Sequence, residues 1–116
     1  MTDLPKKIVG RFYATAHGRR PVRDWLMDLT REDRRQIGID IQRVEFGWPL
    51  GMPYCRSLGN GLWEVRTNLS GGRIARVIFF IHEGQMILLH GFEKKTQKTP
   101  AQDLDLALAR KRDVEL

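Results

Sequence analysis

The chain has few of the residues that build disulfides and metal sites. Among its 116 residues there are one cysteine, Cys55, and only three histidines. A single cysteine cannot form an internal disulfide, and the scattered histidines lack the spacing of zinc ligands. We therefore expect a protein of a reducing compartment that holds no structural metal and needs no cofactor.

Long hydrophobic runs are absent as well. The longest, Val77–Ile81, is far too short to cross a membrane. Lys6 and Lys7 are not followed by an apolar stretch of signal-peptide length. These two absences lead us to expect a cytoplasmic protein with no membrane contact.

The common catalytic signatures of hydrolases are missing too. The sequence shows no carboxylate cluster for magnesium, no glycine-rich phosphate loop, no nucleophile elbow and no paired-histidine ribonuclease motif. RNA differs from other phosphodiesters because its 2′-hydroxyl is a built-in nucleophile. Cations that position the phosphate and stabilise developing charge are therefore chemically sufficient for RNA cleavage.

What the chain does have is a surplus of positive charge on an ordinary globular composition. Hydrophobic residues make up 41% and charged residues 29%, which predicts one folded domain over residues 1–116. Lysine and arginine number 20 against 14 acidic residues, for a net charge of +6. Such a surplus favours a phosphate-bearing or acidic partner, although it also serves as a solubilising surface.

The first half of the chain predicts a strand and two helices. Alternation over Ile8–Ala14 predicts the strand, and Pro21 suits the first turn of a short amphipathic helix that buries Trp25. Thr30, followed by Asp33, resembles the capping box of a second helix. The apolar stripe of that helix consists of Ile37, Ile41 and Val44, and glycines and prolines from Gly47 onward predict an irregular stretch towards Leu58.

The second half predicts a three-stranded meander and a last helix. Extended patterns cover Leu62–Leu69, Arg73–Ile81 and Gln85–Phe92, separated by the turn signals Ser70–Gly72 and Glu83–Gly84. The helix signature consists of Thr99, Pro100 and Gln102, and its buried stripe of Leu104, Ala107 and Leu108. The order predicts an α+β fold with a mostly antiparallel sheet, helices on one face, and the other face free for function.

Two arginines are predicted to meet on this sheet. The turn at Ser70–Gly72 places Arg66 opposite Arg73–Arg76, so guanidinium groups from neighbouring strands are able to converge on one phosphate. The alternative is a set of solvated strand charges, paired with Glu64. Arg76 alternates with apolar residues on its side of the strand, so it is either in an internal salt bridge or at the floor of an anion site.

A second basic group lies between the last strand and the last helix. Lys94, Lys95 and Lys98 are able to meet phosphate oxygens there, although lysine-rich loops are more often flexible and solvated. His90 precedes them in an apolar strand, where a histidine is more often structural than a proton shuttle.

Three segments resemble a known family. The runs Leu62–Arg66, Arg73–Phe80 and, most specifically, Leu88–Pro100 are similar to HigB-like, phage-derived toxins of the RelE/ParE superfamily. The element order resembles that superfamily over nearly the whole chain. The resemblance implies a RelE-like fold and a type II toxin–antitoxin role. It further implies a metal-independent endoribonuclease that cleaves mRNA on the ribosome by 2′-hydroxyl attack and so inhibits translation.

The resemblance also implies site residues and partners. Arg66 and Arg76 match the strand cations of the family, and Lys94 and Lys95 match its basic segment before the last helix, with Arg73 and Lys98 as RNA-binding candidates. The implied partners are a HigA-like helix-turn-helix antitoxin, mRNA and the ribosome, and operator DNA through the antitoxin complex. Relatives often carry a late tyrosine or histidine as acid or base. No tyrosine follows Tyr54 here, which leaves His90 as the nearby titrating candidate.

Two other functions are compatible with the same pattern. A ParE-like toxin would poison DNA gyrase by binding it, with the same fold. A nucleic-acid-binding module or inactive phage remnant would hold phosphate without cutting. The stacked cations of the sheet favour RNA over a protein target.

Overall fold

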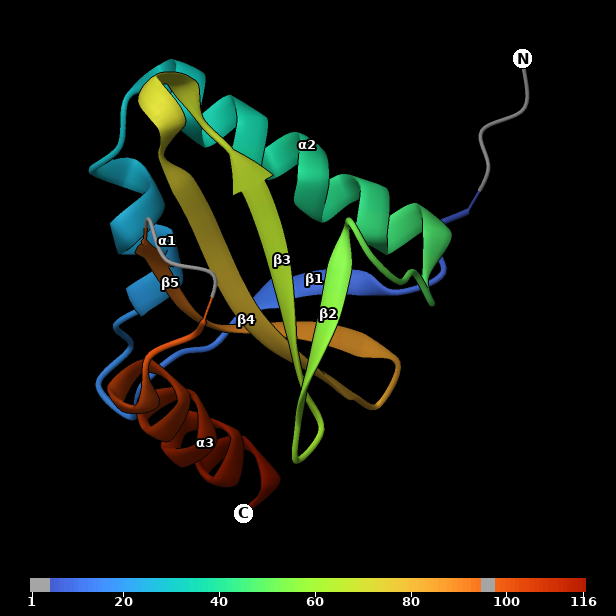
Figure 1. Cartoon of the computed structure of the whole chain (residues 1–116). Coiled ribbons are helices and arrows are strands. Elements are labelled where there is room, and N and C mark those ends of the chain that lie inside the picture. Colours follow the sequence, from blue (N-terminus) through green and yellow to red (C-terminus); the bar gives the residue numbers. More distant parts are fainter. Residues whose placement is uncertain (1–4, 95–97) are drawn as a thin grey trace.

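Five strands form one sheet in the order β1-β5-β4-β3-β2 in the computed structural model, which describes residues 5–94 and 98–116 (Figure 1). Only β1 and β5 are parallel, and the other neighbours are antiparallel. The strands are β1 (Val9–Phe12), β2 (Cys55–Gly59), β3 (Leu62–Asn68), β4 (Ile74–His82) and β5 (Gln85–Glu93). The helices are α1 (Pro21–Met27), α2 (Arg31–Gly47) and α3 (Ala101–Glu115). The predicted α+β class, with a mostly antiparallel sheet, is confirmed.

The predicted starts of the first two helices are confirmed. Pro21 is the first residue of α1, where its fixed φ suits the helix and its missing N–H is no loss. The Thr30 hydroxyl accepts a hydrogen bond from the Asp33 amide at 3.2 Å and caps α2. Trp25 of α1 is half-buried and lies against Gly91, where any Cβ would overlap its ring.

The hairpin turns explain why the meander is readable from sequence. Glu83 and Gly84, the two residues between β4 and β5, both have positive φ, as a type I′ turn requires. Ser70–Gly72 forms a short 3₁₀ turn between β3 and β4, with Gly71 also at positive φ. These local signals set the register of β3, β4 and β5.

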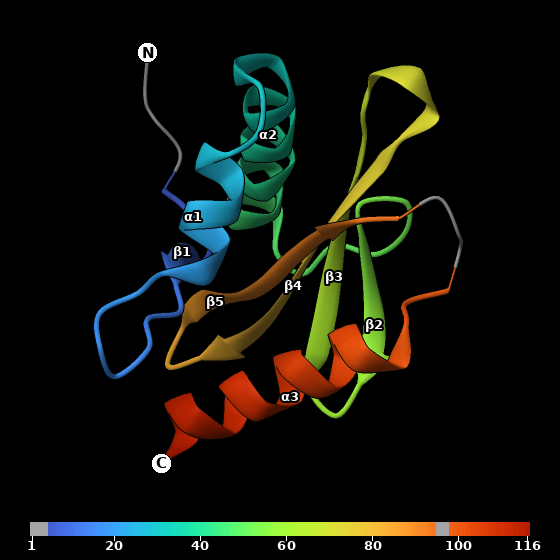
Figure 2. The ribbon, with the colours of Figure 1, turned by 90° about the vertical axis from the view of Figure 1, so that its left-hand side faces the viewer.

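Helices cover both faces of the sheet, so the prediction that they lie on one face is wrong. Helices α1 and α2 pack on one side and α3 on the other (Figure 2). The reason lies in β4, where Val77 and Phe79 belong to the core under α2, while Ile78 and Phe80 belong to the core under α3. A strand that is apolar on both sides needs a cover on both sides.

Strand β2 falls in the stretch that the sequence pattern leaves irregular. It pairs with β3 at the edge of the sheet, and its first residue, Cys55, is buried. Burial raises the pKa of the Cys55 thiol to about 11, so the thiol stays protonated and unreactive at neutral pH.

In the described ranges, no helix combines the length and the apolar character that crossing a bilayer requires.

Candidate functional site

The sheet face under α3 carries a cluster of arginines around one carboxylate. Arg66 of β3 lies directly opposite Arg76 of β4, as predicted, and Arg56 of β2 lies opposite Glu64 of β3. Because opposite residues share a face and positions 64 and 66 are two apart, all four side chains start from the same face. We call these four residues the guanidinium cluster.

Glu64 is the residue of the guanidinium cluster that contacts Arg56, Arg76 and Thr99. Its side chain is fully buried, and its Oε2 accepts a hydrogen bond from the Thr99 hydroxyl at 2.6 Å. Its Oε1 lies 3.5 Å from an Arg56 nitrogen and 3.8 Å from an Arg76 nitrogen. Two guanidinium groups thus share one carboxylate and Arg66 lies opposite Arg76, so the cluster has three cations for one anion and an excess of positive charge.

Arg76 takes part in an internal ion pair. Its side chain has no exposed surface, and burial lowers the pKa of its guanidinium. Glu64 opposes that shift, whereas repulsion from Arg66 and Arg56 lowers the pKa further. The sequence left two roles open for Arg76, an internal salt bridge or the floor of an anion site, and the structure contains the salt bridge. The same repulsion means that an additional anion near these residues would be stabilised.

Arg66 and Arg56 are the half-buried members of the cluster, and Arg66 is the one without a side-chain partner in the described part of the chain. Its backbone N–H donates to Tyr54 O at 3.5 Å. Its side chain has no hydrogen bond or ion pair to any residue in 5–94 or 98–116, and its Nε is buried without a partner there. A buried donor of this kind costs about 1–3 kcal/mol, which an incoming phosphate oxygen would offset.

His90 lies on the same face, held by α3. Its Nε2 is 2.6 Å from Oδ1 of Asp103, and its ring stacks on Phe92 at 5.3 Å between centroids. Phe92 lies opposite Arg76, which places this pair beside the guanidinium cluster. The carboxylate favours a proton on Nε2, so the neutral ring has Nδ1 available as a base. The His90 side chain is therefore fixed by Asp103 and is 16% exposed.

The predicted lysines lie at the end of this face. Lys94 directly follows β5, where its amide donates to Ile74 O at 3.0 Å, and its side chain is exposed. Lys98 is also exposed, two residues before the N-cap of α3. The prediction for Lys95 lies outside the described residues.

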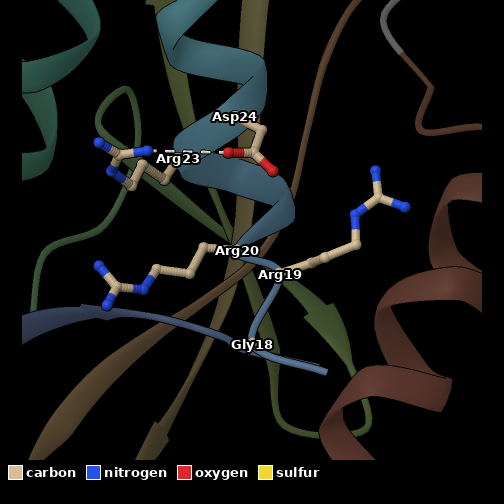
Figure 3. Close-up of a pocket in the computed structure, with 5 residues that line it drawn as sticks. All are labelled: Gly18, Arg19, Arg20, Arg23 and Asp24. Carbon is tan, nitrogen blue, oxygen red and sulfur yellow. Dashed lines mark ion pairs between the residues drawn. The ribbon is translucent and has the colours of Figure 1, made fainter. Parts of the chain in front are cut away.

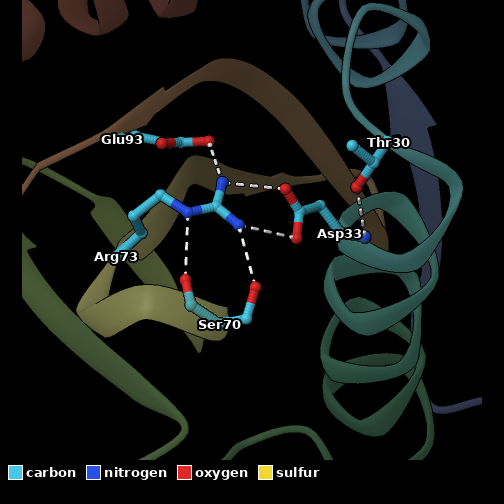
Figure 4. A network of polar contacts seen from close by, with 5 residues as sticks. All are labelled: Thr30, Asp33, Ser70, Arg73 and Glu93. Carbon is cyan, nitrogen blue, oxygen red and sulfur yellow. Dashed lines mark hydrogen bonds and ion pairs between the residues drawn. The ribbon is translucent and has the colours of Figure 1, made fainter.

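Arg73 belongs to a different network (Figure 4). Its guanidinium donates to both oxygens of Asp33, at 2.8 and 3.0 Å, and to Glu93 at 3.2 Å. It also donates to the backbone and side chain of Ser70. Arg73 therefore ties the start of α2 to the β3–β4 turn and the end of β5, while its role as an RNA-binding residue stays a prediction.

The Arg73 network predicts a pH dependence of stability. The hydrogen bond from Arg73 holds the pKa of the Asp33 carboxyl below its usual range. Its stabilisation is therefore full above about pH 4, the ordinary aspartate value, and is lost as pH falls through the lower folded-state pKa. Urea unfolding should show the parent more stable than Asp33→Asn at neutral pH, with the gap narrowing at acid pH. A gap that stays constant would contradict this assignment.

Three residues of the site were not found from sequence. Arg56 lies in the stretch left irregular, and Asp103 lies one helical turn past the predicted helix start. Thr99 was interpreted as a helix cap, but the N-cap of α3 is Pro100 and makes no side-chain bond. The Thr99 hydroxyl bonds Glu64 instead, which is a contact between segments far apart in sequence. An acid at the third helical position was the available signal for Asp103.

The fold and the arginine cluster together indicate a class of protein. The three helices and the five-stranded, mostly antiparallel sheet of the described residues are consistent with a RelE-like fold, here with a cluster of arginines on one face. The chain belongs to the family of phage-derived Gp49-like proteins, whose family model matches residues 24–112. This family is associated with RelE-like toxins. A search of curated proteins found no match.

Proposed function

We propose that the protein is the toxin of a type II toxin–antitoxin system and an endoribonuclease of the HigB-like kind. The observation that carries the proposal is Arg66, a half-buried cation with an unused buried donor, beside two further arginines that share a single carboxylate. This arrangement has excess positive charge where a phosphodiester can approach the sheet. The Gp49-like family membership supports the same function.

The chemistry follows from what the cluster supplies. Arg66, together with Arg56 of the same cluster, would bind the non-bridging oxygens of one phosphodiester and stabilise the charge that grows on them. The 2′-hydroxyl of the preceding nucleotide would give up its proton as its oxygen attacks the phosphorus, and the 5′-oxygen of the next nucleotide would leave and take up one proton, so that the proton lost and the proton gained balance. The products are a 2′,3′-cyclic phosphate and a 5′-hydroxyl, so no water and no metal enters the balance of this step.

His90 is the proton-transfer candidate in this proposal. With Nε2 held by Asp103, its Nδ1 would accept the proton of the 2′-hydroxyl. His90→Gln should lower the rate of RNA cleavage by about 100-fold. The rate is measured on the folded variant at the parent's concentration, and a rate close to the parent's would contradict the role.

The partners follow from the same proposal. The toxin would act on mRNA in the ribosome, with Lys94, Lys95 and Lys98 as proposed contacts to the RNA backbone, and it would be held inactive by a HigA-like helix-turn-helix antitoxin. The antitoxin complex would bind operator DNA. These assignments rest on the resemblance and the family.

The test separates RNA cleavage from gyrase poisoning. The protein is induced without an antitoxin, transcripts are mapped by primer extension, and chromosomal DNA is examined for breaks. The proposal predicts new RNA 5′ ends within minutes and intact DNA. DNA breaks without new RNA ends would overturn the proposal in favour of the ParE-like alternative, and harmless expression would overturn it in favour of a non-catalytic binding module or inactive phage remnant.

A further inference from the structure

Three arginines gather at the start of α1, outside the guanidinium cluster. Arg19, Arg20 and Arg23 line a shallow hollow of about 360 Å³ together with Gly18 and Asp24 (Figure 3). All three arginines are exposed. We call them the α1 arginine patch.

Hydrogen bonds to Thr15 hold the backbone of the loop that carries Arg19. The Thr15 hydroxyl accepts a hydrogen bond from the Arg19 amide at 3.1 Å, and the Thr15 amide donates to Arg19 O at 2.8 Å. The Gly18 amide closes the turn on Thr15 O at 2.9 Å. The loop is thus held by bonds that no side chain of the patch makes, so these side chains can be replaced without losing them.

Little of the charge is neutralised locally. Only Arg23 meets a carboxylate in the described part of the chain, Asp24, at 3.8 Å and with both side chains about half exposed. Exposed pairs of this kind contribute little and leave the cation available. The guanidinium groups of Arg19 and of Arg20 extend in different directions from the chain (Figure 3). That spread suits successive phosphates of a strand better than one small anion.

The composition of the hollow also favours a polyanion over a protein surface. Its lining contains no hydrophobic side chain, whereas the centre of a protein–protein interface is apolar and poor in charge. Arginine, in contrast, binds phosphate through paired donors and needs no apolar surroundings.

The patch adjoins the helix that carries part of the proposed catalytic site. Arg19 and Arg110 of α3 line a common hollow, and Asp103 of the same helix holds His90. Asp103 and Arg110 lie about two turns apart, or roughly 10 Å along the axis. A single strand of a few nucleotides spans that distance.

We propose that the α1 arginine patch binds the backbone of the RNA strand whose scissile phosphate lies at the guanidinium cluster. This inference rests on the proposed function and extends it: the patch contributes to affinity through phosphate contacts and leaves the chemical step to the cluster.

The experiment measures binding of a single-stranded 2′-O-methyl RNA oligomer, which cannot be cleaved by 2′-oxygen attack, as a function of salt. For single strands the slope of log K against log salt is about −0.7 for each phosphate contacted. R19A/R20A/R23A should therefore make the slope shallower by about 2. R31A/R35A/R112A removes three exposed arginines elsewhere and should keep the parent's slope. R19K/R20K/R23K retains the charge, so its slope of log K against log salt should stay close to the parent's.

The outcomes separate this inference from the proposed function. An unchanged slope in R19A/R20A/R23A, with the parent binding RNA, would overturn the patch and leave the cleavage proposal standing. An equal loss in the control triple would also overturn it, because net charge alone would then account for binding. A parent that cleaves no RNA in cells would overturn the proposed function, whatever the slopes. Cleavage by R19A/R20A/R23A should reach the parent's rate at saturating RNA, whereas a lower rate there would place the patch in the chemistry and contradict the division of roles.

Discussion

Arg66→Ala is expected to lower the rate of RNA cleavage by about 100- to 1,000-fold, the usual effect of removing one donor from a charge-stabilising site. The reason is that the Arg66 side chain is half-buried, has no hydrogen bond or ion pair among the described residues, and starts opposite Arg76 in the guanidinium cluster. The rate is measured on mRNA in a reconstituted translation reaction. Loss of this side chain breaks no hydrogen bond or ion pair among the described residues, so the unfolding transition should stay close to the parent's.

Two controls sharpen the Arg66 prediction. Arg35→Ala removes an exposed arginine of α2 and should leave the rate unchanged. Arg66→Lys keeps the charge but loses the paired donors, so it should recover only part of the rate. Full activity of Arg66→Ala would remove this residue from the site.

Arg76→Ala is expected to destabilise the protein by about 3–5 kcal/mol, because it leaves the fully buried Glu64 carboxylate without its buried partner. Urea unfolding measures the effect. The double variant R76M/E64Q should be more stable than Arg76→Ala, since it removes both charges and keeps a group that can bond Thr99. An unfolding free energy within about 1 kcal/mol of the parent's would contradict the internal ion pair.

The contrast between these two arginines decides how activity data are interpreted. Loss of toxicity in Arg76→Ala would follow from unfolding alone, even though both arginines match the same family motif. Only Arg66 offers a variant in which the fold and the reaction separate.

Much of the fold was predictable because its signals are local. The Glu83–Gly84 turn, the Thr30 cap and Pro21 each act within a few residues, and together they define the helices α1 and α2 and the β3–β4–β5 meander. Strand β2 was not predictable in this way. It is short, follows Pro53, and exists because β3 offers it an edge to pair with.

In the site, too, local contacts were predictable and contacts between distant segments were not. The position of Arg66 opposite the Arg73–Arg76 segment follows from one hairpin register and was predicted, and the structure pairs it with Arg76. The partners that settle each arginine's role come from distant segments: Thr99 bonds Glu64, and Asp33 holds Arg73. No spacing rule connects residues 35 or 40 positions apart, so the Thr99–Glu64 bond and the Arg73–Asp33 pair could not be predicted from the sequence.

The most direct test of the guanidinium cluster as an RNA-cleaving site is the mapping of transcript 5′ ends after equal induction of three proteins. These are the parent, Arg66→Ala and Arg35→Ala, each confirmed as folded and present at the same level. The account predicts abundant new 5′-hydroxyl ends with the parent and with Arg35→Ala, and almost none with Arg66→Ala. New ends that are absent with the parent, or equally abundant with Arg66→Ala, would contradict it.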